Sequence, residues 1–98
     1  MYEVRQTRLF AKWLDSLTDL AACERIAQRI ARAQSGLLGD VAAVGEGVGE
    51  MRIHHGPGYR LYFTMRSGVL VILLCGGSKR TQDKDIRKAK DLARDLET

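Results

Sequence analysis

Apolar residues recur along the chain with two different spacings, and the change of spacing separates helices from strands. Over residues 9–17, and again over residues 20–34, they recur at helical spacing, which predicts two amphipathic helices. Thr7 is a suitable N-cap for the first of them. The preceding stretch, residues 2–6, is rich in strand-forming side chains and predicts a short strand.

Beyond Gly39 the apolar residues alternate with polar ones, as they do in half-buried strands. Turn-forming residues divide this part of the chain, and its single proline lies in the turn Gly56-Pro57-Gly58. The predicted strands are residues 41–44, 50–54, 60–66 and 69–75. The last of these, VLVILLC, is apolar on both faces, which is typical of a central strand. A final amphipathic helix is predicted from Gln82.

The resulting order is strand, two helices, four strands and helix, without repeated strand–helix–strand units. It predicts an α+β fold in which a mainly antiparallel sheet carries helices on one face. A length of 98 residues suits a single domain over residues 1–98. Gly45, Gly47 and Gly49 are interpreted as turn residues, and Trp13 as part of the core.

Cysteine content and hydropathy indicate an intracellular setting. Cys23 and Cys75 both lie in apolar surroundings, where reduced, buried thiols are common. The longest apolar run, residues 69–75, is too short to span a bilayer, and residues 1–20 lack a signal-peptide pattern. We therefore expect a cytoplasmic protein without a membrane segment.

The net charge of +4 is concentrated in one segment. Acidic and basic residues balance over residues 1–49, and again over residues 83–98. Between them, a single carboxylate, Glu50, stands against five basic residues, which are Arg52, Arg60, Arg66, Lys79 and Arg80. Such a segment suits a polyanion or an acidic partner, although a solvated sheet face has the same composition.

The alternation along the strands gathers candidate chemistry on one face. The apolar residues of the two strands beside the proline turn are expected to face the helices, so that their neighbours share the other face. Those neighbours are Arg52, His54, Arg60 and Tyr62. Lys79 approaches them from the Gly-Gly-Ser-Lys loop after the central strand. Arg32, on the exposed side of a predicted helix, is expected to lie away from this patch.

These side chains suit RNA cleavage without a metal ion. The reaction needs the 2′-hydroxyl deprotonated, the leaving 5′-oxygen protonated, and the charge on the reacting phosphate stabilised. An arginine fork matches two phosphate oxygens, and a histidine titrates near neutral pH. Tyr62 and His54 are both candidates for stacking or proton transfer, and the residues alone do not rank them. Arg66, Arg80 and Tyr59 are further candidates for RNA contacts, whereas Arg60 has the alternative of pairing with Glu50.

Other kinds of site find no support in the residues. The two cysteines lie far apart, and no Cys/His spacing of a zinc site is present. No glycine-rich phosphate loop leads from a strand into a helix. We therefore expect neither a metal ion nor a nucleotide cofactor.

Four stretches, taken together and in this order, resemble a known family. They are FAKWLDSL, RIARAQSGLLGD, VGEGVGEMRIHHGPGYRLYF and VILLCGGSKRTQDKDIRKA. The E-x-R-I, G-P-G-Y-R-x-Y-F and G-G-x-K-x-T-Q-x-x-D-I blocks within them are similar to those of the RelE/ParE toxins, in the Gp49/HigB-like addiction module killer branch. The likeness runs from about Phe10 to Ala89.

The resemblance implies the toxin of a type II toxin–antitoxin module, with two N-terminal helices packed on a curved antiparallel sheet. The expected partner is a cognate antitoxin that carries an acidic segment and a DNA-binding domain. RelE-type members cut mRNA in the ribosomal A site with basic residues, which correspond by position to Arg52, Arg60 and Lys79 here. The resemblance therefore implies a ribosome-dependent mRNA interferase, an endoribonuclease without a cofactor, whose second partner is mRNA on the ribosome.

The chain departs from the RelE pattern at the start of its last helix. RelE-type enzymes commonly place a tyrosine or histidine just after the glycine-containing loop, where this chain reads Thr81-Gln82-Asp83-Lys84-Asp85. Tyr62 or His54 would have to supply the missing group. Two alternatives therefore stay open, namely a ParE-like poison of DNA gyrase and a catalytically inactive member that binds an antitoxin or regulator.

Overall fold

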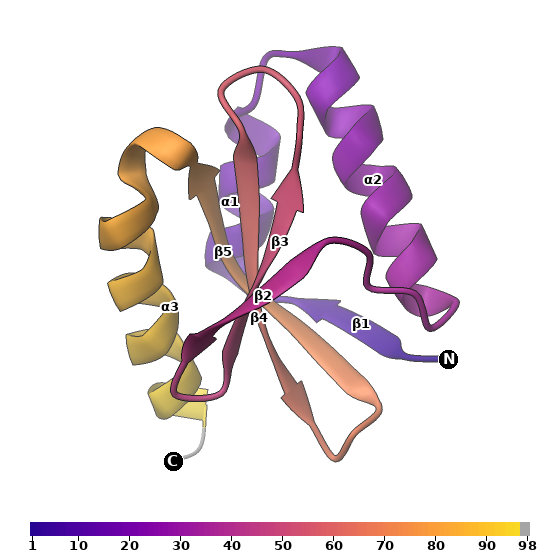
Figure 1. Cartoon of the computed structure of the whole chain (residues 1–98), viewed down its shortest axis with the longest axis vertical. Coiled ribbons are helices and arrows are strands. Elements are labelled where there is room, and N and C mark those ends of the chain that lie inside the picture. The colour runs from indigo at the N-terminus through magenta and orange to yellow at the C-terminus, as the bar shows by residue number, and fades with distance from the viewer. Residues whose placement is uncertain (97–98) are drawn as a thin grey trace.

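The computed structural model describes residues 1–96 and has the predicted α+β architecture (Figure 1). Its elements in chain order are β1 (Glu3–Gln6), α1 (Arg8–Ser16), α2 (Leu20–Gln34), β2 (Val41–Gly45), β3 (Val48–Ile53), β4 (Tyr59–Arg66), β5 (Leu70–Ser78), a short 3-10 turn (Lys79–Thr81) and α3 (Gln82–Leu96). The predicted order of helices and strands is therefore confirmed. No helix within the described part of the chain is both long and apolar enough to cross a membrane.

The five strands form one sheet in the order β1-β5-β4-β3-β2. Strands β2 to β5 pair as antiparallel neighbours, and β1 pairs with β5 in parallel. Because β1 and β2 lie at opposite edges of the sheet, the α1–α2 hairpin between them carries the chain from one edge to the other. The apolar strand VLVILLC is interior, as predicted, since β5 lies between β1 and β4.

The helices cover both faces of the sheet, so the prediction of helices on one face was wrong. Leu61 and Phe63 of β4 join a core with residues of α1 and α2, such as Phe10 and Ile26. On the opposite face, Tyr62 packs with Ala89 and its neighbours from α3. The two core clusters arise because alternate residues of β4 point to opposite sides of the sheet.

Local caps fix where the first two helices begin. The Thr7 hydroxyl accepts a hydrogen bond from the Phe10 amide at 3.0 Å and donates one to the Leu74 carbonyl at 2.6 Å. It thereby satisfies the helix N-terminus and ties α1 to β5. Asp19 caps α2 by accepting from the amides of Ala21 and Ala22.

Two glycines allow aromatic rings to lie directly on the sheet. Gly49 is inside β3 and not in a turn, which corrects the interpretation from the sequence, and a Cβ there would lie 2.5 Å from the Phe63 ring. Strand β5 continues through Gly76, where a Cβ would lie 2.3 Å from the ring of Trp13. Trp13 is half-buried, and its ring meets Tyr59 edge-on at 6.2 Å between centroids. A side chain at either glycine would overpack the sheet.

Both cysteines have free thiols, in agreement with the sequence. Burial raises the pKa of Cys75 to about 12, so this thiol stays protonated at neutral pH. Cys23 is half-buried on α2.

Candidate functional site

The β3–β4 turn and the 3-10 turn after β5 enclose a surface pocket of about 440 Å³. Its lining consists of His54, His55, Gly56, Pro57, Gly58, Arg60 and Lys79, and we call it the turn pocket. A hydrogen bond of 2.9 Å from the Lys79 amide to the Gly58 carbonyl holds the two turns together. The structure thus brings Arg60, Lys79 and His54 to one place.

Arg60 lies deeper than an ordinary surface arginine. It stands directly opposite Arg52 on β3 and opposite Gly77 on β5, and only 9 % of its surface is exposed. Two like charges facing each other across a strand pair repel. A nearby carboxylate is therefore needed to hold both arginines on this face.

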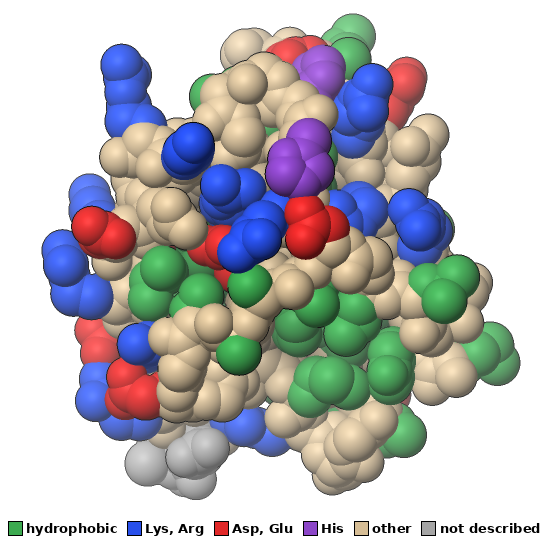
Figure 2. Space-filling view, in the orientation of Figure 1, with side chains coloured by type: hydrophobic (Ala, Val, Ile, Leu, Met, Phe, Trp, Pro, Cys, Tyr) green, Lys and Arg blue, Asp and Glu red, His purple; other side chains and the backbone are tan. Residues whose placement is uncertain are grey.

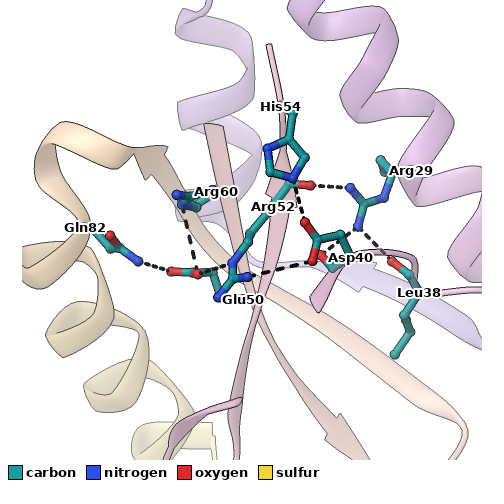
Figure 3. A network of polar contacts seen from close by, with 8 residues as sticks. All are labelled: Arg29, Leu38, Asp40, Glu50, Arg52, His54, Arg60 and Gln82. Carbon is teal, nitrogen blue, oxygen red and sulfur yellow. Dashed lines mark hydrogen bonds and ion pairs between the residues drawn. The ribbon is translucent and has the colours of Figure 1, made fainter. Parts of the chain in front are cut away.

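Glu50 supplies that carboxylate from within the sheet (Figure 3). It is 1 % exposed, and its Oε1 atom lies 3.2 Å from Nε of Arg52 and 4.0 Å from Nε of Arg60. The side-chain amide of Gln82, at the start of α3, donates to Oε2 at 2.8 Å. Glu50 therefore orients both arginines and links them to α3. Gln82 takes this structural role at the segment where RelE-type enzymes carry a tyrosine or histidine.

Tyr62 lies two pairs further along the same strands than Arg60, opposite Glu50 and under α3. It is fully buried, and burial together with the charge of Glu50 raises the pKa of its hydroxyl. Because α3 covers this part of the sheet, Tyr62 does not reach the turn pocket. Of the two residues that the sequence left unranked for stacking or proton transfer, His54 alone is accessible there.

Each histidine of the turn is paired with an aspartate from a distant segment. Nε2 of His54 lies 2.6 Å from Oδ2 of Asp40, just before β2, and Nε2 of His55 lies 3.0 Å from Oδ2 of Asp19, the N-cap of α2. These hydrogen bonds lower the pKa of Asp40 and of Asp19. A carboxylate on one ring nitrogen fixes the imidazole and leaves the other nitrogen for a ligand.

The pairing of Asp40 with His54 makes a testable prediction for acid stability. The pKa of folded Asp40 is below its ordinary value of 3.8, so its contribution to stability is present above that value and is lost as the pH falls through the lowered pKa. We expect the free energy of unfolding of the Asp40→Asn variant to lie below that of the wild type at neutral pH, with the gap narrowing below about pH 4. Urea denaturation at several pH values measures it. The difference in unfolding free energy caused by Asp40→Asn should be smaller in a His54→Ala background. A difference that does not depend on pH would contradict the stabilising pair of Asp40 and His54.

Comparison with known proteins identifies the family. Residues 12–97 match the family model described as "Phage derived protein Gp49-like". The chain belongs to the Gp49-like family. It is also 50 % identical over 94 residues to an uncharacterized protein of Haemophilus influenzae, covering 96 % of this chain and 95 % of that protein. Gp49-like proteins are addiction module killer, RelE-like toxins, and toxins of this kind are paired with an antitoxin.

The remaining candidate residues of this Gp49-like chain lie outside the turn pocket. Tyr59 and Arg80 line a neighbouring pocket of about 480 Å³ beside Trp13. Arg66 lies at the far end of β4, where it donates to the Ala93 carbonyl of α3 at 3.1 Å. Arg66 thus fastens α3 and is not brought near Arg60.

Several residues of the site carried no recognisable signal in the sequence. Asp19, Asp40 and Gln82 come from separate segments, and only the folded sheet brings them to Glu50 and the histidines. His55, which the sequence did not single out, also lines the turn pocket. Over residues 1–96, no cluster of three or more His, Cys, Asp or Glu side chains forms a metal-binding group.

Proposed function

We propose that this Gp49-like toxin is a ribosome-dependent mRNA interferase that cuts mRNA by attack of the 2′-hydroxyl. The observation that carries the proposal is the turn pocket itself, which holds Arg60, Lys79 and His54 together while Glu50 keeps Arg52 beside Arg60. Two guanidinium groups and an ammonium group suit a phosphodiester whose negative charge grows in the transition state.

The two histidines suit the two proton transfers. When Nε2 of His54 donates to Asp40, its Nδ1 is free to accept the proton of the 2′-hydroxyl. The 2′-oxygen then forms a bond to phosphorus while the bond from phosphorus to the 5′-oxygen breaks. Protonated His55 gives its proton to the departing 5′-oxygen. The products are a 2′,3′-cyclic phosphate and a 5′-hydroxyl, so atoms and protons balance without another reactant.

Arg60 and Lys79 have different parts in this scheme. Arg60, with its planar fork, donates to two non-bridging oxygens of the reacting phosphate, and Arg52 adds its charge from the adjacent strand. Lys79, at the exposed 3-10 turn, neutralises the charge of the RNA backbone next to the reacting phosphate. In this proposal the ribosome presents the mRNA to the turn pocket in an extended form.

Mapping mRNA ends after brief expression of the toxin in a bacterial host tests the proposal. Primer extension should find cuts inside translated codons, and a transcript without a ribosome-binding site should remain intact. A gyrase supercoiling assay runs in parallel. Growth arrest with intact mRNA and altered supercoiling would replace this proposal with a gyrase poison, and the absence of arrest would favour an inactive member that binds an antitoxin.

A further inference from the structure

A second basic pocket adjoins the turn pocket. It has a volume of about 240 Å³ and lies between α2 and β3. Its lining consists of Arg25, Gln28, Arg29, Arg32, Arg52, Ile53 and His54, and we call it the arginine pocket. His54 lines both pockets. The expectation that Arg32 lies away from the patch was therefore wrong, because Arg32 shares a pocket with Arg52 and His54.

Helical spacing explains how α2 supplies three of these arginines. Residues 25, 29 and 32 follow one another at intervals of four and three, so their side chains leave the same face of the helix. That face is turned toward β3, since Arg29 donates a hydrogen bond to the carbonyl oxygen of Arg52 (Figure 3).

Arg29 is already engaged by the protein itself. Besides the Arg52 carbonyl it donates to the carbonyl oxygens of Leu38 at 2.9 Å and Asp40 at 3.1 Å. Partial burial, and next the charge of Arg32, lower the pKa of Arg29. Arg29 thus fixes the loop before β2 against α2.

Arg25 and Arg32 flank this anchored arginine. Within residues 1–96, neither of their side chains forms a hydrogen bond or an ion pair. None of the lining residues is acidic, and the nearby carboxylate of Asp40 is already paired with His54. The charges of Arg25 and Arg32 are therefore left for an external anion.

We propose that the arginine pocket binds the backbone phosphates of the RNA strand that continues out of the turn pocket. Arg25 and Arg32 are its phosphate ligands, and Arg29 is the positioning residue between them. The inference rests on the proposed function and deepens it by adding a second subsite. Figure 2 shows basic side chains, with a few acidic ones among them, gathered around the histidines in the upper half of the molecule, above an apolar area.

The lining favours RNA over an acidic protein segment. Its one aliphatic residue, Ile53, is 3 % exposed, so the pocket offers no apolar anchor of the kind that protein interfaces bury at their centre. Guanidinium groups in a row match the repeated phosphates of a single strand. The pocket shares His54 with the turn pocket, so one strand can occupy both.

Binding of an uncleavable RNA tests the subsite without depending on catalysis. The probe is a fluorescent, fully 2′-O-methylated RNA of about 12 nucleotides, within the range that small single-strand sites cover. Fluorescence anisotropy at low salt should show the Arg25→Ala/Arg32→Ala double variant binding about tenfold more weakly than the wild type. The slope of log affinity against log salt should become shallower by about 1.4, since each phosphate contact on a single strand adds about 0.7. Arg8→Ala/Lys12→Ala, a matched loss of two charges on α1 outside both pockets, should change neither value by as much.

The outcomes separate this inference from the proposed function. Affinity and salt slope unchanged in the double variant, or a wild type that does not bind the probe, would overturn the inference, while cuts in translated mRNA in cells would still support the proposed function. Polyglutamate that binds through Arg25 and Arg32, with RNA binding independent of them, would likewise overturn it and make the pocket a protein-binding site.

Discussion

Replacing Arg60 by lysine is expected to abolish growth arrest while leaving the fold intact. Lysine keeps a positive charge near the buried Glu50 but loses the planar fork that donates to two phosphate oxygens. Loss of one such donor in a transition state lowers the rate by about 10²-fold or more. In purified ribosomes programmed with mRNA, the cleavage rate of Arg60→Lys should fall by at least about that factor.

Arg8→Lys provides the matched control for this experiment. Arg8 is an exposed arginine at the start of α1 and lines neither the turn pocket nor the arginine pocket. It should retain full toxicity and cleavage. Thermal unfolding of both variants shows whether they fold. An Arg60→Lys protein that unfolds at the wild-type temperature and still arrests growth would show that the site has been assigned wrongly.

The second large effect is expected on stability, from Glu50→Ala. This change leaves Arg60, whose side chain is 11 % exposed, without its carboxylate, and it removes the acceptor of the Gln82 amide. Breaking a buried charge pair from one side destabilises a protein by about 3 kcal/mol or more. For a chain of this size that corresponds to a fall in Tm of more than about 10 °C. Differential scanning calorimetry measures it directly.

Two further variants decide why Glu50 matters. Glu50→Gln keeps a hydrogen-bond acceptor for Gln82 but removes the charge between Arg52 and Arg60. Its Tm should therefore lie between that of the wild type and that of Glu50→Ala. Glu3→Ala breaks an exposed pair with Arg5 and should change stability by about 0.5 kcal/mol or less. If Glu50→Ala lowers stability no more than Glu3→Ala does, the Arg60 side chain can turn toward solvent at little cost. The contacts of Glu50 would then not stabilise the sheet.

Local pattern was sufficient for the elements and for much of the site. Helices and strands were predicted because the spacing of apolar residues depends only on neighbours a few positions away. The same spacing placed Arg52 and Arg60 on one face of the β3–β4 hairpin, and the turn at Pro57 brought His54 near them. The interior position of β5 was likewise predictable, because its residues are apolar on both faces.

The sequence by itself determined the order of elements and the basic hairpin, whereas the tertiary structure alone decided what surrounds that hairpin. Only packing shows that α3 covers the sheet face opposite α1 and α2, which buries Tyr62. Packing also pairs Asp40 with His54 and lays Arg32 beside Arg52. The physical reason is that these contacts join segments far apart in the chain, and the hydrophobic period of a segment carries no information about which distant segment will pack on it.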